Sequence, residues 1–311
     1  MTAPILNPTP EAITRAAQAL RAGRLVAMPT ETVYGLAARA DDPVAVASIY
    51  TAKGRPKFNP LIAHCANLEM AQREGDFSAN ALKLAAAFWP GPLTLVVNLA
   101  SSHTVCDLAR AGLDSIAIRV PAHPVAQALL SEIGKPLVAP SANPSGKISP
   151  TEAAHVAADM GEKLDLILDG GACQAGVEST IIDARGKAPA LLRPGSLDPD
   201  QIESVWPGLI RPAQNPDAPQ SPGQLLRHYA PNARLRLNAD APHDSEAYLG
   251  FGPGPATLNL SPTQDLTEAA SNLFSMLRRL DAMHDKIAVA PIPNHGLGEA
   301  INDRLTRAAQ Q

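Results

Sequence analysis

Three cations, Lys53, Arg55 and Lys57, stand in a single turn of the sequence that prolines interrupt. Like charges this close repel each other unless an anion lies between them. Arginine offers a planar fork of donors and lysine a point charge, and the two together suit a triphosphate. The alternative is a solvated basic turn on the surface, and the turn alone does not decide between the two.

A second polar turn, residues 141–150, follows an apolar stretch and carries Ser141, Asn143 and Ser149. Its prolines and glycine bend the backbone so that small hydroxyls and amides can point one way. Ser149 precedes a proline and is a good N-cap for the helix that follows, whose N-terminus favours an anion. Simple capping of turns by Ser and Asn remains the competing interpretation.

Arg119 ends an alternating strand, residues 115–121, in which it shares one face with Ser115 and Ala117. A cation on a face of small residues invites a carboxylate ligand, whereas the alternative is a surface arginine. Ser179 at the start of a later strand and Arg193 at the end of another add polar strand ends. Several such ends gathered over one sheet would make a pocket.

The elements that must position these residues alternate between strand and helix, although not strictly. A polar segment, residues 29–36, follows a buried strand at 25–28, and a strand at 60–63 delivers His64 to its end. Further strands are expected at 93–99, 115–120, 136–140, 164–168, 179–183 and 190–193. Helices are expected to begin at Thr9, Asp42, Ser78, His123 and Thr151. This order favours an α+β protein with a twisted mixed sheet and flanking helices over a pure βαβ winding.

The proline-rich segment 207–232 divides the chain into residues 1–206 and 233–311. Scarce apolar residues and repeated prolines are typical of a stiff linker. In the second part, strands at 247–251 and 287–291 alternate with helices at 265–281 and 298–309. The sequence therefore predicts a large first domain, a linker and a small α/β second domain.

Composition narrows the class of protein. A net charge of −4 argues against a protein whose whole surface binds nucleic acid. The three cysteines form no disulfide framework and favour a reducing compartment. No signal peptide and no apolar run near the roughly 20 residues of a membrane span are seen, so we expect a soluble cytoplasmic protein without a membrane partner. Neither a Walker A loop, a Gly-x-Ser-x-Gly elbow nor a histidine metal spacing is present.

The two polar turns together resemble the YrdC-type threonylcarbamoyl-AMP synthase family in its long two-domain form. The motifs that carry the resemblance are residues 29–36, Lys53-Gly54-Arg55-Pro56, Asn59-Pro60-Leu61, Pro90 to Thr94, Ser141-Ala142-Asn143, Arg193-Pro194-Gly195, Ser221 to Pro231 and Gly296-Leu297-Gly298. The departures, Ala37-Ala38-Arg39 and Gln224, remove no polar ligand.

The resemblance implies a YrdC-like catalytic domain with a basic groove and a small Rossmann-like C-terminal domain. It implies an enzyme that uses L-threonine, bicarbonate or CO2, and ATP with Mg²⁺. The products would be threonylcarbamoyl-AMP and pyrophosphate, the former passed to the tRNA threonylcarbamoyl-transfer machinery. A weak direct contact with tRNA is compatible with it.

The resemblance also assigns roles to residues. Lys53 and Arg55 would be catalytic and would neutralise the phosphates. The amino acid would be held by Thr32, His64, Arg119 and Ser179. ATP would be held by Lys53, Arg55, Asn59, Ser115, Ser141, Asn143, Ser149, Arg193 and, from a lid formed by the linker, Tyr229. No protein side chain would bind the metal, which ATP would carry.

Two other functions remain open from the sequence. One is a non-catalytic module that binds double-stranded RNA or tRNA with the same fold, and its binding would fall steeply with salt. The other is a carbamoyl-transfer enzyme built on the same domain. The cysteine count excludes the zinc fingers that such enzymes carry.

Overall fold

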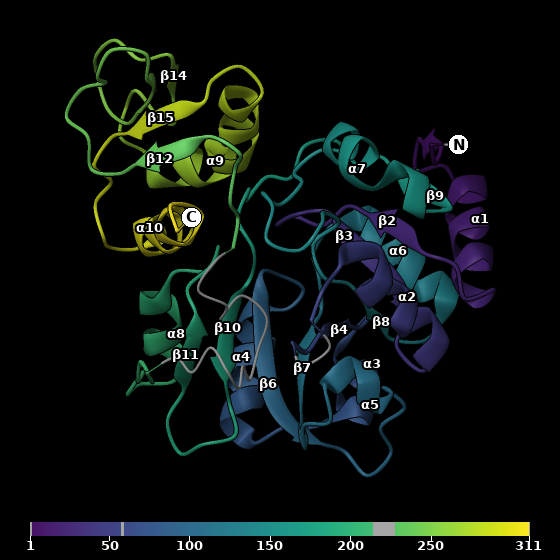
Figure 1. Ribbon diagram of the computed structural model, residues 1–311. Coiled ribbons are helices and arrows are strands. Elements are labelled where there is room, and N and C mark those ends of the chain that lie inside the picture. Colours follow the sequence, from purple (N-terminus) through teal and green to yellow (C-terminus); the bar gives the residue numbers. More distant parts are fainter. Residues whose placement is uncertain (1, 57–58, 214–227, 311) are drawn as a thin grey trace.

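The computed structural model describes residues 2–56, 59–213 and 228–310. Within these residues the chain forms two α/β domains, one large and one small (Figure 1). The large domain is built on an eleven-stranded mixed sheet and the small one on a four-stranded parallel sheet. The predicted fold class is therefore confirmed. Much of the predicted linker, residues 214–227, lies outside the described residues.

The large sheet mixes parallel and antiparallel neighbours. Its order is β1 (Ile5–Leu6), β9 (Leu166–Leu168), β2 (Val26–Met28), β3 (Gly35–Arg39), β8 (Leu137–Val138), β4 (Ile62–His64), β7 (Ser115–Arg119), β6 (Leu93–Leu99), β10 (Thr180–Asp183) and β11 (Ala190–Arg193), with β5 (Gly75–Asp76) paired to β6. Strands β4 and β7 are parallel, so that His64 and Arg119 are register partners at their ends. Strand β6 is antiparallel to β7 and places Thr94 beside Arg119.

Helices flank this sheet, and four of those described begin at the predicted caps Thr9, Asp42, Ser78 and His123. They are α1 (Pro10–Arg21), α2 (Pro43–Lys53), α3 (Leu68–Glu74), α4 (Ala79–Phe88), α5 (Asp107–Arg110), α6 (Pro124–Ile133), α7 (Ala153–Met160), the 3-10 helix η1 (Gly161–Lys163) and α8 (Pro199–Val205). The Asp42 side chain accepts from the backbone N–H groups of Val44 and Ala45 at the start of α2. Gly54 ends this helix in the left-handed conformation, with φ of 61°.

One predicted cap is wrong. Helix α7 begins at Ala153 with Glu152 as its N-cap residue, three positions after Ser149. The Ser149 hydroxyl donates instead to the buried carboxylate of Glu178, with 2.5 Å between the oxygens. A hydrogen bond to an ionised group is stronger than one to a neutral group. The Ser149 hydroxyl therefore bonds to the carboxylate and does not cap the helix.

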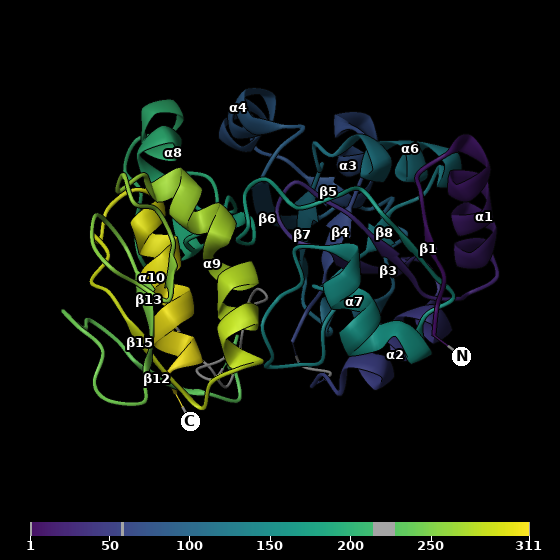
Figure 2. The same ribbon diagram turned by 90° about the horizontal axis from the view of Figure 1, so that it is seen from above.

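The small domain has strand order β12 (Arg234–Arg236), β15 (Lys286–Val289), β13 (Ala247–Gly250), β14 (Leu258–Asn259), and two long helices, α9 (Leu266–Asp281) and α10 (Leu297–Ala308). Figure 2 shows its sheet on the outer side, with α9 next to the large domain. The helices and two of the strands are as predicted, whereas the short strands β12 and β14 are not foreseen. No helix among the described residues combines the length and apolarity needed to cross a membrane.

The core of the small domain continues into the large domain. Val33, Ile148 and Val177 of the large domain belong to the same buried apolar cluster as the small domain's α9 and α10 residues. Tyr229, from the segment between the domains, joins this cluster and stacks on Phe274 of α9, with 5.5 Å between ring centroids. The two domains are therefore joined by shared burial of apolar surface, which stabilises their contact.

Candidate active site

The two polar turns singled out in the sequence meet in the structure. The Lys53 ammonium, at the end of α2, donates to the Ser141 carbonyl oxygen at 2.5 Å and also to the Asn143 carbonyl oxygen. In return, the Ser145 N–H donates to the Lys53 carbonyl oxygen at 2.8 Å. Lys53 is buried, and this burial, followed by the nearby charge of Arg55, lowers its pKa.

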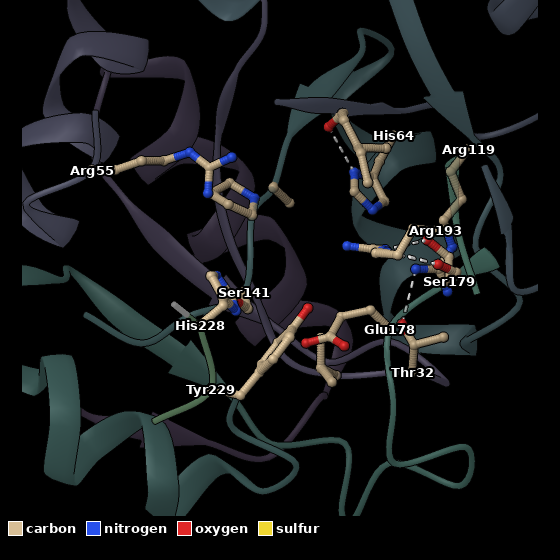
Figure 3. A pocket seen from close by; sticks show the side chains of 14 residues that line it. Thr32, Arg55, His64, Arg119, Ser141, Glu178, Ser179, Arg193, His228 and Tyr229 are labelled. Carbon is tan, nitrogen blue, oxygen red and sulfur yellow. Dashed lines mark hydrogen bonds between the residues drawn. The ribbon is translucent and has the colours of Figure 1, made fainter. Parts of the chain in front are cut away.

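A cavity opens beside these turns at the ends of the large sheet's central strands (Figure 3). The space inside it that a water-sized molecule can occupy is about 50 Å³. Eight residues predicted for the site line it: Thr32, Arg55, His64, Arg119, Ser141, Ser179, Arg193 and Tyr229. The other lining residues are Val33, Ile62, Ala139, Pro140, Glu178 and His228.

Arg55 enters the cavity from the turn after α2. Its guanidinium donates to two backbone carbonyl oxygens, those of Asn59 at 3.3 Å and Pro60 at 2.9 Å. Burial, with a smaller contribution from Arg193, lowers its pKa to about 10. A guanidinium held by carbonyl oxygens keeps its charge without a carboxylate partner, and such a group attracts an anion.

Arg119 lies at the other side of the cavity, at the end of β7. Its guanidinium donates to the Thr32 hydroxyl at 2.8 Å and lies 2.6 Å from the Glu31 carboxylate. The Glu31 contact is an ion pair that lacks the alignment of a hydrogen bond. Burial alone would raise the pKa of the Glu31 carboxyl, but the charge and close contact of Arg119, together with backbone N–H donors such as that of Ala122, outweigh burial and lower it. Nε donates to the Gly91 carbonyl oxygen at 3.3 Å, so the free edge of this guanidinium is at Nη2, whose N–H groups lack an aligned acceptor.

His64 is buried beside Arg119 and is neutral. Burial and then the charge of Arg119 lower its pKa to about 3. Its Nδ1 lies 3.1 Å from the carbonyl oxygen of Ile62, which can only accept a hydrogen bond. Nδ1 therefore carries the proton, and Nε2 is left as an acceptor in a residue that lines the cavity.

Ser179 and Arg193 form a third side of the cavity. The Arg193 guanidinium donates to the Ser179 carbonyl oxygen at 2.8 Å and to its hydroxyl at 3.2 Å. This hydroxyl also lies 2.8 Å from that of Thr94. Gly195 makes the approach possible, because a Cβ there would stand 2.3 Å from the backbone of Ser179.

Glu178 lines the cavity, and the sequence prediction does not include it. It is buried, and both of its oxygens are engaged, one by the Ser149 hydroxyl at 2.5 Å and one by Arg304 of α10 at 3.0 Å. Burial would raise its pKa, but the charges of Arg304 and Arg193 bring it down to about 2. The signal in the sequence is a carboxylate two positions before the start of strand β10, next to the hydroxyls of Ser179 and Thr180.

Five predicted site residues, Lys53, Asn59, Ser115, Asn143 and Ser149, do not line this cavity. The Lys53 ammonium and the Asn143 carbonyl oxygen form a hydrogen bond between the two turns. The Ser149 hydroxyl is hydrogen-bonded to Glu178, which itself lines the cavity. Ser115 starts β7 and pairs with Asn98. It therefore lies about 13 Å along the strand from Arg119.

Unpartnered polar atoms occur in the cavity lining, at His228 and Tyr229, and in the two turns beside it, at Asn59 and Asn143. Among the described residues no hydrogen-bond partner exists for the buried atoms Asn59 Oδ1, Asn143 Oδ1, His228 Nδ1 and Tyr229 OH. Buried polar atoms without partners are costly, and a polar ligand would satisfy them. No group of three or more His, Cys, Asp or Glu side chains that could hold a metal ion occurs in the described part of the chain.

Comparisons with known proteins agree with this geometry. Residues 18–195 match the family model Sua5_yciO_yrdC, described as "Telomere recombination". Residues 197–310 match the model described as "Threonylcarbamoyl-AMP synthase, C-terminal domain".

Relatives match over nearly the whole chain. A threonylcarbamoyl-AMP synthase of Pyrococcus abyssi is 41% identical, with 94% of this chain and 93% of the relative covered. One of Bacillus subtilis is 38% identical, with 96% and 92% covered. The crystal structure of P. abyssi Sua5 complexed with L-threonine has a TM-score of 0.90 at 39% identity, covering 98% of this chain and 97% of that one.

Proposed function

The chain belongs to the Sua5/YrdC family of threonylcarbamoyl-AMP synthases, and we propose that its cavity joins L-threonine, CO2 or bicarbonate, and ATP. It is an ATP-using enzyme of the nucleotidyltransferase type. The single observation that carries the proposal is the arrangement of the cavity. An anion-binding side at Arg55 and a side that combines Arg119, a hydroxyl and a neutral imidazole open into one space.

The side that contains Arg119 is suited to an amino acid. The free edge of the Arg119 guanidinium would bind the threonine carboxylate in a charge-assisted contact. His64 Nε2, an acceptor, would receive a hydrogen bond from the substrate's ammonium or hydroxyl group. Thr32 and Ser179 would supply hydroxyls to the remaining polar groups.

The side that contains Arg55 is suited to the triphosphate. Arg55 and Arg193 would neutralise phosphate oxygens, while Lys53 keeps the turn at 141–147 in place behind them. Ser141, Asn143, Asn59 and Tyr229 would contribute polar contacts to the nucleotide, with Ser115 and Ser149 farther from the cavity. Mg²⁺ bound by ATP would supply additional neutralisation of the phosphate charge.

The reaction needs a short-lived carbamate to meet a phosphate. The threonine amine adds to CO2 and loses a proton, and a carbamate oxygen then forms a bond to the α-phosphorus. The bond from that phosphorus to the pyrophosphate oxygen breaks, and pyrophosphate leaves with the electron pair. Buried cations and fixed donors favour this step by holding the reactants in line and by neutralising the departing charge.

The product is a labile adenylate, and we propose that it passes to a tRNA-modifying acceptor enzyme. We also propose a cytoplasmic location, because Cys65, Cys106 and Cys173 are unpaired, as is usual for proteins in reducing compartments.

The test is pyrophosphate release by the purified full chain. Release should require ATP, L-threonine and bicarbonate together, and mass spectrometry should detect threonylcarbamoyl-AMP. Pyrophosphate release that persists without threonine, or an absence of release in the complete mixture, would contradict the proposed reaction.

A further inference from the structure

Helix α10 of the small domain reaches the wall of the active site through Arg304. We propose that Arg304 is a positioning residue of the synthase reaction, which acts on nucleotide binding by fixing Glu178 and, through it, Ser149. The inference rests on the proposed function, since the cavity that Glu178 lines is assigned there to ATP and Ser149 is hydrogen-bonded to Glu178. It also gives the C-terminal domain a task in the reaction.

The contacts of Arg304 cross the boundary between the domains. Its side chain is fully buried, at 0% exposure. Nε donates to Glu178 Oε2 at 3.0 Å, and Nη1 donates to the Pro194 carbonyl oxygen at 2.6 Å. The Tyr229 ring lies 5.4 Å from the guanidinium carbon, a cation–π distance. One side chain therefore joins three segments that border the cavity.

Glu178 transmits this contact to the site. Its second oxygen, Oε1, accepts the Ser149 hydroxyl at 2.5 Å, so the carboxylate bridges Arg304 and Ser149. Arg304 itself does not line the cavity, whereas Glu178 does. Arg304 thus acts on the substrates only through its neighbours.

The charge balance around Glu178 depends on Arg304. The titratable groups that face this carboxylate are Lys53, Arg193, His228, Tyr229 and Arg304. Of these, Arg304 makes the largest contribution to the low pKa of Glu178. Without Arg304, less positive charge would offset the burial of the Glu178 carboxylate, so the pKa of Glu178 would rise.

A second contact from the small domain holds the same part of the site. Arg278 of α9 donates to the carbonyl oxygens of Ile148 and Ser149 and pairs with Asp159 at 2.6 Å. The loop before Glu178 packs closely against α9. The contact is so close that a Cβ added to Gly176 would stand 2.3 Å from the Ala270 carbonyl oxygen. Both members of the Ser149–Glu178 pair are therefore held from the small domain.

The experiment compares Arg304→Met with a matched control in the full chain. The control is Arg211→Met, because Arg211 forms an ion pair of 2.8 and 3.0 Å with Glu299, on the same helix α10, but is exposed and away from the cavity. We expect Arg304→Met to raise the KM for ATP at least tenfold while the KM for threonine changes less than threefold. Arg211→Met should change neither. Arg304→Lys, which keeps the charge, should recover part of the lost ATP affinity.

A pH series distinguishes positioning from simple loss of folding. As the pH is lowered, the KM for ATP of Arg304→Met should change at a higher pH than that of the wild type, because the pKa of Glu178 is raised, and Arg304→Met/Glu178→Gln should lose this difference. A purely structural role would lower the active fraction and the melting temperature with the KM for ATP unchanged, and that result would overturn the inference. Failure of the proposed function is a separate result, because the wild type would then release no pyrophosphate.

Discussion

The Lys53 ammonium lies 2.5 Å from the carbonyl oxygen of Ser141 and also donates to that of Asn143. The lysine of the basic turn is therefore a clasp between two segments that are 88 to 90 residues apart in sequence. Arg55, two positions later, makes only local carbonyl contacts and lines the cavity. The two neighbouring cations have different tasks, and substitutions should separate them.

Lys53→Met should abolish pyrophosphate release and also destabilise the fold. It leaves two carbonyl oxygens without their donor, and each buried unsatisfied group costs about 1–3 kcal/mol. Arg55→Met should weaken ATP binding at least a hundredfold while the melting temperature falls less than in Lys53→Met, because the Asn59 carbonyl oxygen keeps the Tyr50 hydroxyl as a donor. Thermal unfolding and calorimetric ATP titration of both variants provide the measurement. An unchanged melting temperature for Lys53→Met would show that the clasp is not structural.

Arg119→Gln should raise the KM for threonine about 30- to 100-fold, because a charge-assisted contact to a carboxylate contributes about 2–3 kcal/mol. The KM for ATP should change little, since Arg119 lies on the other side of the cavity from Arg55. Arg24→Gln is a matched control, because Arg24 pairs with Asp165 on the surface. Equal losses of ATP and threonine affinity in Arg119→Gln would argue against a carboxylate-binding role.

Tyr229→Phe should reduce ATP affinity about three- to tenfold, the loss expected for one hydrogen bond of about 0.5–1.5 kcal/mol. The Tyr229 hydroxyl is buried and has no hydrogen-bond partner among the described residues, so its removal should not reduce the melting temperature. Tyr248→Phe is the control, since its hydroxyl donates to the Ala239 carbonyl oxygen within the small domain. Wild-type ATP affinity in Tyr229→Phe would remove this hydroxyl from the nucleotide site.

His64 should make the ligand-free protein less stable in acid. Its folded-state pKa of about 3 lies below the ordinary value of 6.5, so the unfolded chain binds the proton first as the pH falls. The stabilisation is complete above pH 6.5 and is lost toward pH 3, at up to about 1.4 kcal/mol per pH unit. Urea unfolding between pH 7 and 4 should show a shallower loss for His64→Gln than for the wild type. Replacement of the exposed His295 by Gln should leave the slope as it is.

Capping residues and end glycines in the sequence correctly predict where the helices beside them begin and end. Thr9 and Asp42 cap the helices that follow them, and Gly54 ends α2, because capping depends on the backbone of the same few residues. Strand β3, Gly35–Arg39, was not predicted. Its run of small residues has no alternation, and it becomes a strand through pairing with the preceding strand β2 on one side and with β8, far away in sequence, on the other.

In the site, too, the sequence predicts the contacts that recognisable motifs signal and misses those between residues without such a motif. The Lys-x-Arg and Ser-x-Asn motifs predict that two turns meet, and the structure brings them together. The Arg304–Glu178 pair spans 126 positions, and neither residue carries a local pattern that points to the other. Ser149 illustrates the reverse error: its position before a proline indicated a cap, but a distant carboxylate took the hydroxyl.

The apolar cluster that Val33, Ile148 and Val177 share with the second domain restricts how this chain can be shortened. A fragment that ended at residue 206 would expose three side chains that are now at most 7% exposed, on a surface next to the substrate cavity. Such a patch favours self-association in a free fragment. A chain without the second domain would therefore need polar side chains at these positions or another means of covering them.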